Sequence, residues 1–136
     1  MAAYQFDSSK GTYLQSSSAV IPESGDLTIS VMAKLENASP TYGEILSQGK
    51  SVPDNSTATV GFYLGYDRGY VRVGDSWQNT SVAFPSDSNW HTYQVVKTVS
   101  TGLLYIDGIL KATNNNFKNP NIGSNLRVGA QFEGYG

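Results

Sequence analysis

The sequence contains no cysteine and a single histidine, His91. The absence of cysteine excludes disulfides, zinc–thiolate sites and a cysteine nucleophile. A single histidine also excludes a metalloenzyme centre that uses several histidine ligands. Charge is scarce: nine basic and eleven acidic residues give a net charge of -2, without the basic stripe of a nucleic-acid-binding protein. Apolar runs are only a few residues long, whereas a membrane-spanning helix needs about 20. We therefore expect neither nucleic-acid binding nor membrane insertion.

Glycine and tyrosine are abundant, with 14 and 9 residues, which favours an all-β domain with tight turns over a helical bundle. The stretch LTISVMAKL alternates apolar and polar residues, which indicates a half-buried strand. The predicted strands are two around the turn DSSKG, then LTISVMAKL, YGEILSQG, two within VGFYLGYDRGYVRVGDSWQ, NTSVAFP, WHTYQVVKTV, LLYI, ILKAT and LRVGAQF, with KSVPDNSTAT and NNNFKNPNIGSN as loops. The two strands within VGFYLGYDRGYVRVGDSWQ are joined at YDRG, which we expect to form a turn of three to four residues with a glycine. This pattern predicts one domain, residues 1–136, folded as an antiparallel two-sheet β-sandwich of jelly-roll type.

An aspartate between apolar residues, Asp107 in YIDGIL, raises the question of a catalytic acid. Asp-Gly between two apolar runs is the strongest short signal of a hairpin, because a type I′ turn needs positive φ at both central residues. We therefore interpret Asp107 as a turn residue, and Asp107→Asn should preserve fold and binding because Asn-Gly makes the same turn. One face of this hairpin would carry Leu103, Tyr105, Leu110 and Ala112, and the other Leu104, Ile106, Ile109 and Lys111, with Tyr105 facing Leu110 and Ile106 facing Ile109. Since both faces are largely apolar, we place the hairpin well inside the two layers.

The order of several segments resembles the laminin-G-like branch of the concanavalin A-like lectin/glucanase superfamily. WHTYQVVKTVSTGLLYIDGILKA is similar to that branch's Trp-His strand followed by an L-Y-I-D-G hairpin. YQFDSSKGTYLQ, GDLTISVMAKL, GEILSQGK and LRVGAQF resemble its F-D-G…Y-V, F-T-I-S-x-W-V-K, I-L-S-K-G and L-x-I-G strands, in the same order. The resemblance covers nearly the whole chain and implies a concanavalin A-like sandwich. It says less about function, because this fold hosts lectins, adhesion modules and enzymes.

The sequence departs from the family pattern at several points. Ser8 replaces the usual glycine after Asp7, Met32 stands near the usual tryptophan, and Thr92 stands where a second histidine often sits. Family members usually end with a further strand of the type G-x-I-D-E-V-R-I-Y, and here the sequence stops at FEGYG. We expect a sandwich without that last strand, which exposes a sheet edge unless a partner chain or the N-terminal segment fills the gap. This favours a fragment of a longer protein.

The spacing of the acids argues against glycoside hydrolysis, the main enzymatic activity of the superfamily. That reaction needs two carboxylates about 5 to 9 Å apart, and glucanase members present them from one strand as E-x-D-x-x-E. Here no two acidic residues lie two or four positions apart. A Ser-His-Asp site would need His91 as its base. In the family pattern, however, a Trp-His pair such as Trp90-His91 begins a strand and helps to pack the end of that strand. We therefore interpret His91 as a structural residue and predict a noncatalytic protein.

Calcium is the one cofactor for which the sequence offers candidate ligands. The ion binds carboxylate, amide and backbone carbonyl oxygens. Laminin-G-like domains carry calcium near the opening F-D turn or in the rim loops, so the resemblance implies Asp7 as a ligand. Asp26 lies in a rim turn and is the second candidate. The alternative is that both carboxylates cap turns through hydrogen bonds to nearby backbone amides.

Sugar binding needs an aromatic ring for the apolar face of a pyranose and polar groups for its hydroxyls. The candidate residues are Trp77 with Asp75, Gln78 and Asn79 in GDSWQNTS, then Tyr66, Asp67, Arg68 and Tyr70 at the YDRG hairpin tip, and Tyr42 in SPTYGE. Trp77 is the leading candidate for the ring. The alternative for each aromatic residue is packing on the rim of a sheet or over an open face.

The sequence thus favours a noncatalytic, lectin-like module that binds a glycan or polysaccharide. The alternative is a structural or adhesive domain that packs against other domains or subunits of a larger assembly, such as a phage virion protein or a bacterial surface protein. A glycoside hydrolase or lyase is a third hypothesis, which the spacing of the acidic residues disfavours. Both leading hypotheses place the domain outside the cell, on its surface or on a virion, although MAAYQFDSSKG lacks the charged start and apolar stretch of a signal peptide.

Overall fold

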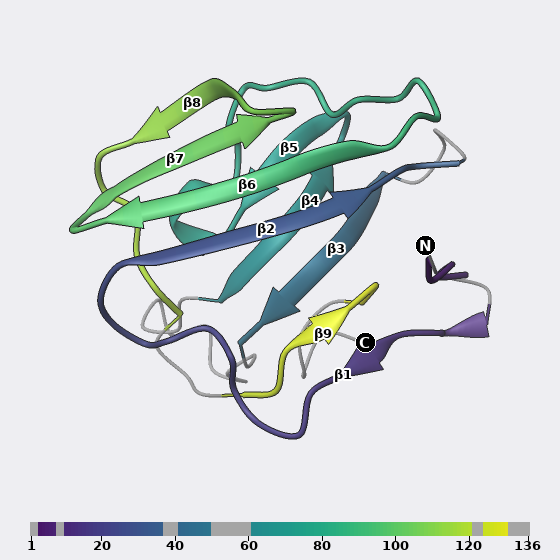
Figure 1. Cartoon of the computed structure of the whole chain (residues 1–136), viewed down its shortest axis with the longest axis horizontal. Helices are drawn as coiled ribbons and strands as arrows, with labels where there is room; N and C mark the ends of the chain where they lie inside the picture. Colours follow the sequence, from purple (N-terminus) through teal and green to yellow (C-terminus); the bar gives the residue numbers. More distant parts are fainter. Residues whose placement is uncertain (1–2, 8–9, 37–40, 50–60, 121–123, 131–136) are drawn as a thin grey trace.

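The computed structural model describes residues 3–7, 10–36, 41–49, 61–120 and 124–130. Over these residues the chain forms a β-sandwich of two antiparallel sheets (Figure 1), which confirms the predicted fold class. One sheet contains, in spatial order, β1 (Leu14–Gln15), β9 (Arg127–Val128), β3 (Tyr42–Gln48), β4 (Phe62–Asp67) and β5 (Tyr70–Val73). The other contains β2 (Leu27–Ala33), β6 (His91–Thr98), β7 (Thr101–Ile106) and β8 (Ile109–Asn114). None of the described residues forms a helix long and apolar enough to cross a membrane.

Strand β2 shows how the alternation in the sequence becomes a face of the core. Leu27, Ile29, Val31 and Ala33 are partly buried and pack against the core, whereas Thr28, Ser30 and Met32 are exposed. Successive side chains of a strand point to opposite faces, so this alternation turns the apolar set inward. Within the described part of the chain β2 pairs only with β6 and therefore forms an edge of its sheet.

The hairpin between β7 and β8 forms at Asp107 and Gly108, whose φ angles are 52° and 77°. Both central residues therefore have the positive φ that a type I′ turn requires. The expected pairs, Tyr105 with Leu110 and Ile106 with Ile109, are confirmed.

Two expectations about the same hairpin were wrong. A β-bulge after Leu104 places Ala112 opposite Leu104, whereas we expected Ala112 to share a face with Leu103. An inserted residue of this kind shifts which side chains face each other. In addition, β8 is an edge strand in which Ile109 is 59% exposed and Leu110 is 50% exposed. The hairpin therefore lies at the rim of the sandwich rather than deep inside it.

The second hairpin, β4–β5, turns at Arg68 and Gly69, whose φ angles are 49° and 88°. The loop is thus a two-residue turn, shorter than the three to four residues predicted from YDRG. This tight turn fixes Asp67 directly opposite Tyr70 across the hairpin.

Other predicted strands are shorter in the structure or are missing from it. Of the two strands expected around DSSKG, the described residues form only β1, which pairs with β9. LRVGAQF contributes the two-residue strand β9, and NTSVAFP contributes an isolated bridge between Tyr70 and Ala83. The predicted loop KSVPDNSTAT, together with residues 131–136, lies outside the described residues.

The core lies between the two sheets and is rich in aromatic residues. Phe62, Tyr93 and Phe117 are almost completely buried. Phe84 stacks on Tyr93 with ring centroids 5.3 Å apart, and Phe117 meets Phe62 edge-to-face at 6.3 Å. The rings therefore link β4, β6 and the segments that follow β5 and β8, which fixes how the two sheets sit on each other.

Candidate functional site

Tyr42, Asp67 and Tyr70 lie side by side across three neighbouring strands. Strand pairing sets Tyr42 opposite Asp67, and Asp67 opposite Tyr70. Directly opposed residues in an antiparallel sheet project from the same face. Tyr42 is 50% exposed and Tyr70 is 47% exposed, and their strands are separated by about 10 Å because neighbouring strands lie about 4.8 Å apart. We call these three residues the tyrosine row. The sequence predicted its members as separate candidates, and strand pairing brings them together.

Arg68 adds a fixed cation beside the tyrosine row. Its guanidinium donates a hydrogen bond of 3.1 Å to the Tyr42 hydroxyl and lies 6.0 Å from the centre of that ring. Arg68 Nε is also 3.5 Å from Asp67 Oδ1. The hydrogen bond to Tyr42 and the nearby Asp67 raise the pKa of the exposed Arg68 guanidinium further above its ordinary value. The rim thus presents two exposed rings, a carboxylate and a guanidinium on one surface.

A buried ion pair lies in the next row of the same sheet face. Glu44, Gly65 and Arg72 are aligned across β3, β4 and β5, and the Arg72 guanidinium donates to the Glu44 carboxylate. Gly65 leaves room for this contact, because a Cβ there would lie 2.9 Å from Glu44 Oε2. The Arg72 guanidinium also stacks over the Tyr63 ring at 4.0 Å. The pair joins β3 to β5 in the row next to the tyrosine row.

Trp77 and Tyr66 do not lie on the surface. Trp77 is 8% exposed and meets Phe117 edge-to-face at 6.0 Å, and Tyr66 is 7% exposed and packs on Phe84 at 4.9 Å. This corrects one premise of the sequence prediction, which took Trp77 as the leading exposed ring. Burial has a physical reason, because the short 3-10 helix η2 (Asp75–Trp77) directs the indole back into the core.

The residues around Trp77 are not part of the tyrosine row. Gln78 and Asn79 are exposed, and Asn79 Oδ1 accepts a hydrogen bond of 2.8 Å from the amide of Ser81. Tyr70 begins β5, whereas η2 follows the other end of that strand. The chain then turns back along β5, so Asn79 precedes Thr80, whose amide donates to the carbonyl of Val71. The backbone of Asp75 belongs to η2, and its side chain lies outside the described part.

Asp7 makes contacts within its own turn, whereas Asp26 contacts the turn between β6 and β7. The Asp7 carbonyl accepts a hydrogen bond of 3.0 Å from the amide of Lys10, whose ammonium lies 3.5 Å from the Asp7 carboxylate. Asp26 Oδ1 accepts one of 2.6 Å from the amide of Val99. Among the described residues no group of three or more histidine, aspartate and glutamate side chains is placed to hold a metal ion. Calcium at Asp7 and Asp26 stays a prediction.

His91 is held between two carboxylates, an arrangement that the sequence analysis missed. Its Nδ1 is 2.7 Å from Asp107 Oδ2, and its Nε2 is 2.8 Å from Asp87 Oδ1. Asp107 Oδ1 also accepts a hydrogen bond of 2.9 Å from the backbone amide of Thr92. We call Asp87, His91 and Asp107 the histidine clamp. It joins the start of β6 to the β7–β8 turn and to the preceding loop. The one signal in the sequence was the family pattern, which pairs a histidine at a strand start with the L-Y-I-D-G turn.

The clamp shifts the pKa values of all three groups. Hydrogen bonds to Asp107 and then Asp87 raise the pKa of His91. The hydrogen bond to His91 lowers the pKa of Asp87 to about 2 and is also the main reason that the pKa of Asp107 is lowered. Because both ring nitrogens face carboxylate oxygens, the imidazole can donate to both only as the imidazolium. Neither nitrogen is then open to take a proton from a nucleophile, as a general base must.

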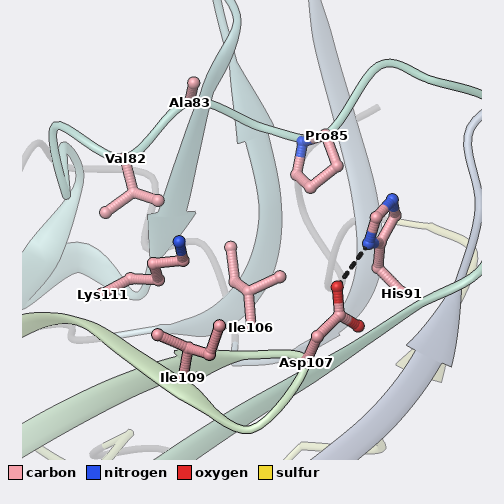
Figure 2. A pocket seen from close by; sticks show the side chains of 8 residues that line it. All are labelled: Val82, Ala83, Pro85, His91, Ile106, Asp107, Ile109 and Lys111. Carbon is pink, nitrogen blue, oxygen red and sulfur yellow. Dashed lines mark hydrogen bonds and ion pairs between the residues drawn. The ribbon is translucent and has the colours of Figure 1, made fainter.

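A cavity of about 340 Å³ opens beside the histidine clamp (Figure 2). It is lined by Val82, Ala83, Pro85, His91, Ile106, Asp107, Ile109 and Lys111. The cavity lies between the β7–β8 hairpin and the 82–85 segment, which borders β5 through the bridge from Tyr70 to Ala83. Tyr70, the last residue of the tyrosine row, therefore pairs with a wall residue of the cavity.

Comparison with known proteins adds nothing to this geometry: no protein-family model matches the chain, and neither does any curated protein.

Proposed function

We propose that this domain is a noncatalytic glycan-binding module whose primary contact is the tyrosine row. The observation that carries the proposal is the alignment of two exposed tyrosines on either side of Asp67, with Arg68 fixed beside them. Sugar rings pack their apolar faces on aromatic rings, and their hydroxyls need donors and acceptors nearby. The resemblance to laminin-G-like domains is consistent with this function, and it favours a location outside the cell, on its surface or on a virion.

The mechanism is reversible docking without a covalent step. A saccharide lying across β4 places its apolar face on Tyr42 or Tyr70. It accepts hydrogen bonds from Arg68, and its hydroxyl groups donate hydrogen bonds to the Asp67 carboxylate. Because Arg68 already donates a hydrogen bond to Tyr42 and lies 3.5 Å from Asp67, part of its side-chain freedom is lost before the saccharide binds.

The test is a glycan array probed with the wild type and with the variants Tyr42→Ala and Tyr70→Ala. Each variant should weaken binding about tenfold, since burying one aromatic ring contributes about 1.5 kcal/mol or more. Tyr13→Ala is the matched control, because Tyr13 is 46% exposed and stacks with Arg127 at 5.1 Å on the same sheet but away from the row. A wild type that binds no glycan at high micromolar concentration would overturn the proposal, as would equal losses in all three variants.

A structural or adhesive role in a larger assembly is the second candidate function. It is favoured by the edge of β2, which pairs only with β6 among the described residues. This strand presents seven residues, Leu27–Ala33, without a charge or a proline, and its inward side chains are only partly buried. Such an edge is a template for pairing with another strand. Sedimentation of the purified chain should then show self-association that Ser30→Pro abolishes, because proline removes a backbone donor and blocks pairing. A chain that stays monomeric at high concentration would contradict this role.

A further inference from the structure

The cavity beside the histidine clamp has the composition of a small-ligand site. Its volume of about 340 Å³ lies within the range of about 300 to 1,000 Å³ that ligand pockets occupy. Ile106 lies at its centre in Figure 2, with Val82, Pro85 and Ile109 around it. Three polar side chains also line it, those of His91, Asp107 and Lys111. An apolar wall with a few convergent polar groups favours a ligand that has one apolar face and several polar substituents.

The charges around the cavity are divided between its two sides. Asp107 and His91 lie together on one side of the view in Figure 2, and the Lys111 amine lies on the other. The histidine clamp contains two carboxylates and one imidazolium, so it carries a net negative charge. Lys111 has no ion pair in the part of the chain that the structure describes. An anionic group on a ligand is therefore repelled from the clamp and attracted to Lys111.

The clamp side of the cavity can still accept hydrogen bonds. Asp107 accepts one hydrogen bond from His91 through Oδ2 and one from the amide of Thr92 through Oδ1. An ionised carboxylate has about four acceptor positions. Two acceptor positions are then open to hydroxyl groups. A ligand that suits the whole cavity has hydroxyl donors at one end, a carboxylate at the other, and an apolar face between them.

We propose that this cavity binds a carboxylated sugar residue. The carboxylate of the sugar forms an ion pair with Lys111, and the hydroxyl groups of the sugar donate hydrogen bonds to Asp107. The inference rests on the proposed glycan binding and names its substrate class as acidic glycans. Because Tyr70 pairs with Ala83 of the cavity wall, a glycan on the tyrosine row can continue around the β5 edge into the cavity.

The test is titration of the ¹⁵N-labelled chain with sodium glucuronate, glucose and sodium acetate, followed by NMR. Glucuronate should shift the amides of Asp107, Ile109 and Lys111 and bind about tenfold more tightly than either glucose or acetate. Lys111→Met should reduce glucuronate affinity to that for glucose. Lys118→Met removes the same charge from an exposed lysine that does not line the cavity, and it should leave binding unchanged.

Several outcomes would overturn the inference. Equal affinity for acetate and glucuronate would mean that Lys111 attracts any carboxylate, and equal affinity for glucose and glucuronate would remove the role of Lys111. Equal effects of the two lysine variants would show a general effect of net charge. The proposed function fails separately: if neutral glycans bind and depend on Tyr42 and Tyr70 while the cavity amides do not shift, only the acidic-sugar site is refuted.

Discussion

Replacing Tyr93 with phenylalanine should stabilise the domain, although tyrosine there packs well. The Tyr93 side chain is completely buried, and its ring stacks on Phe84 at 5.3 Å. Within the described part of the structure its hydroxyl has no hydrogen-bond partner. Burial, followed by the nearby charges of Asp107 and Asp87, raises the pKa of this hydroxyl above its ordinary value, so it stays neutral.

The expected magnitude follows from the cost of burying an unpaired hydroxyl. That cost is about 1 to 3 kcal/mol. Phenylalanine removes it and keeps the stacked ring, at the loss of the few dispersion contacts of one oxygen. We therefore expect the free energy of unfolding to rise by about 1 kcal/mol, which raises the melting temperature by about 3 to 5 °C for a domain of this size.

Urea unfolding followed by circular dichroism measures the change directly. Tyr42→Phe is the matched control, because its hydroxyl is on an exposed residue and accepts a hydrogen bond from Arg68. Such surface changes usually stay within about 0.5 kcal/mol. If Tyr93→Phe lowers stability by 1 kcal/mol or more, the hydroxyl has a partner and the reasoning is wrong.

The remaining predictions concern the core and the histidine clamp. Gly102→Ala should lower stability by about 1 to 3 kcal/mol in urea unfolding because of overpacking, since a Cβ at Gly102 would lie 2.7 Å from Phe117 Cγ; no loss would show that Phe117 can move. The raised pKa of His91 means that the clamp contributes its full stability below pH ~6.5 and loses it as the pH rises through the folded-state pKa. Its lowered carboxyl pKa values mean that the contribution is also lost as the pH falls from about 4 toward 2. The melting temperature of the wild type should therefore fall as the pH rises above about 6.5, and that of His91→Gln should fall less; parallel curves would refute the clamp. Asp107→Asn should keep the turn, yet NMR titration should show the pKa of His91 returning toward its ordinary value.

Asp107 has a second role, in the histidine clamp, that the sequence did not indicate. The Asp-Gly signal correctly predicted the turn, because the φ angles that the turn needs are a local property of two residues. The bond from Asp107 to His91 joins residues sixteen positions apart, and its formation depends on how β6 and β7 pair. Asparagine can thus replace the aspartate in the turn but cannot replace its charge in the clamp.

The candidate site shows the same division between local and distant information. The sequence identified Tyr42, Arg68 and Tyr70 as surface candidates, since aromatic and polar residues beside turns are typical of rims. Trp77 matched the same local pattern and is buried, because its direction depends on η2 and on contact with Phe117. Composition cannot distinguish an exposed ring from a buried one when both follow a strand end.

By itself the sequence determined the all-β class, the tight turn at Asp107 and Gly108, and the inward face of β2. These follow from alternation with a period of two and from residues that accept positive φ, both of which act over a few positions. The tertiary structure alone decided that Tyr42 stands beside Asp67 and Tyr70, that Asp87 and Asp107 hold His91, and that a cavity opens next to Lys111. Each of these depends on which strands become neighbours and in which register, and register is set by burial of the whole core rather than by any one segment.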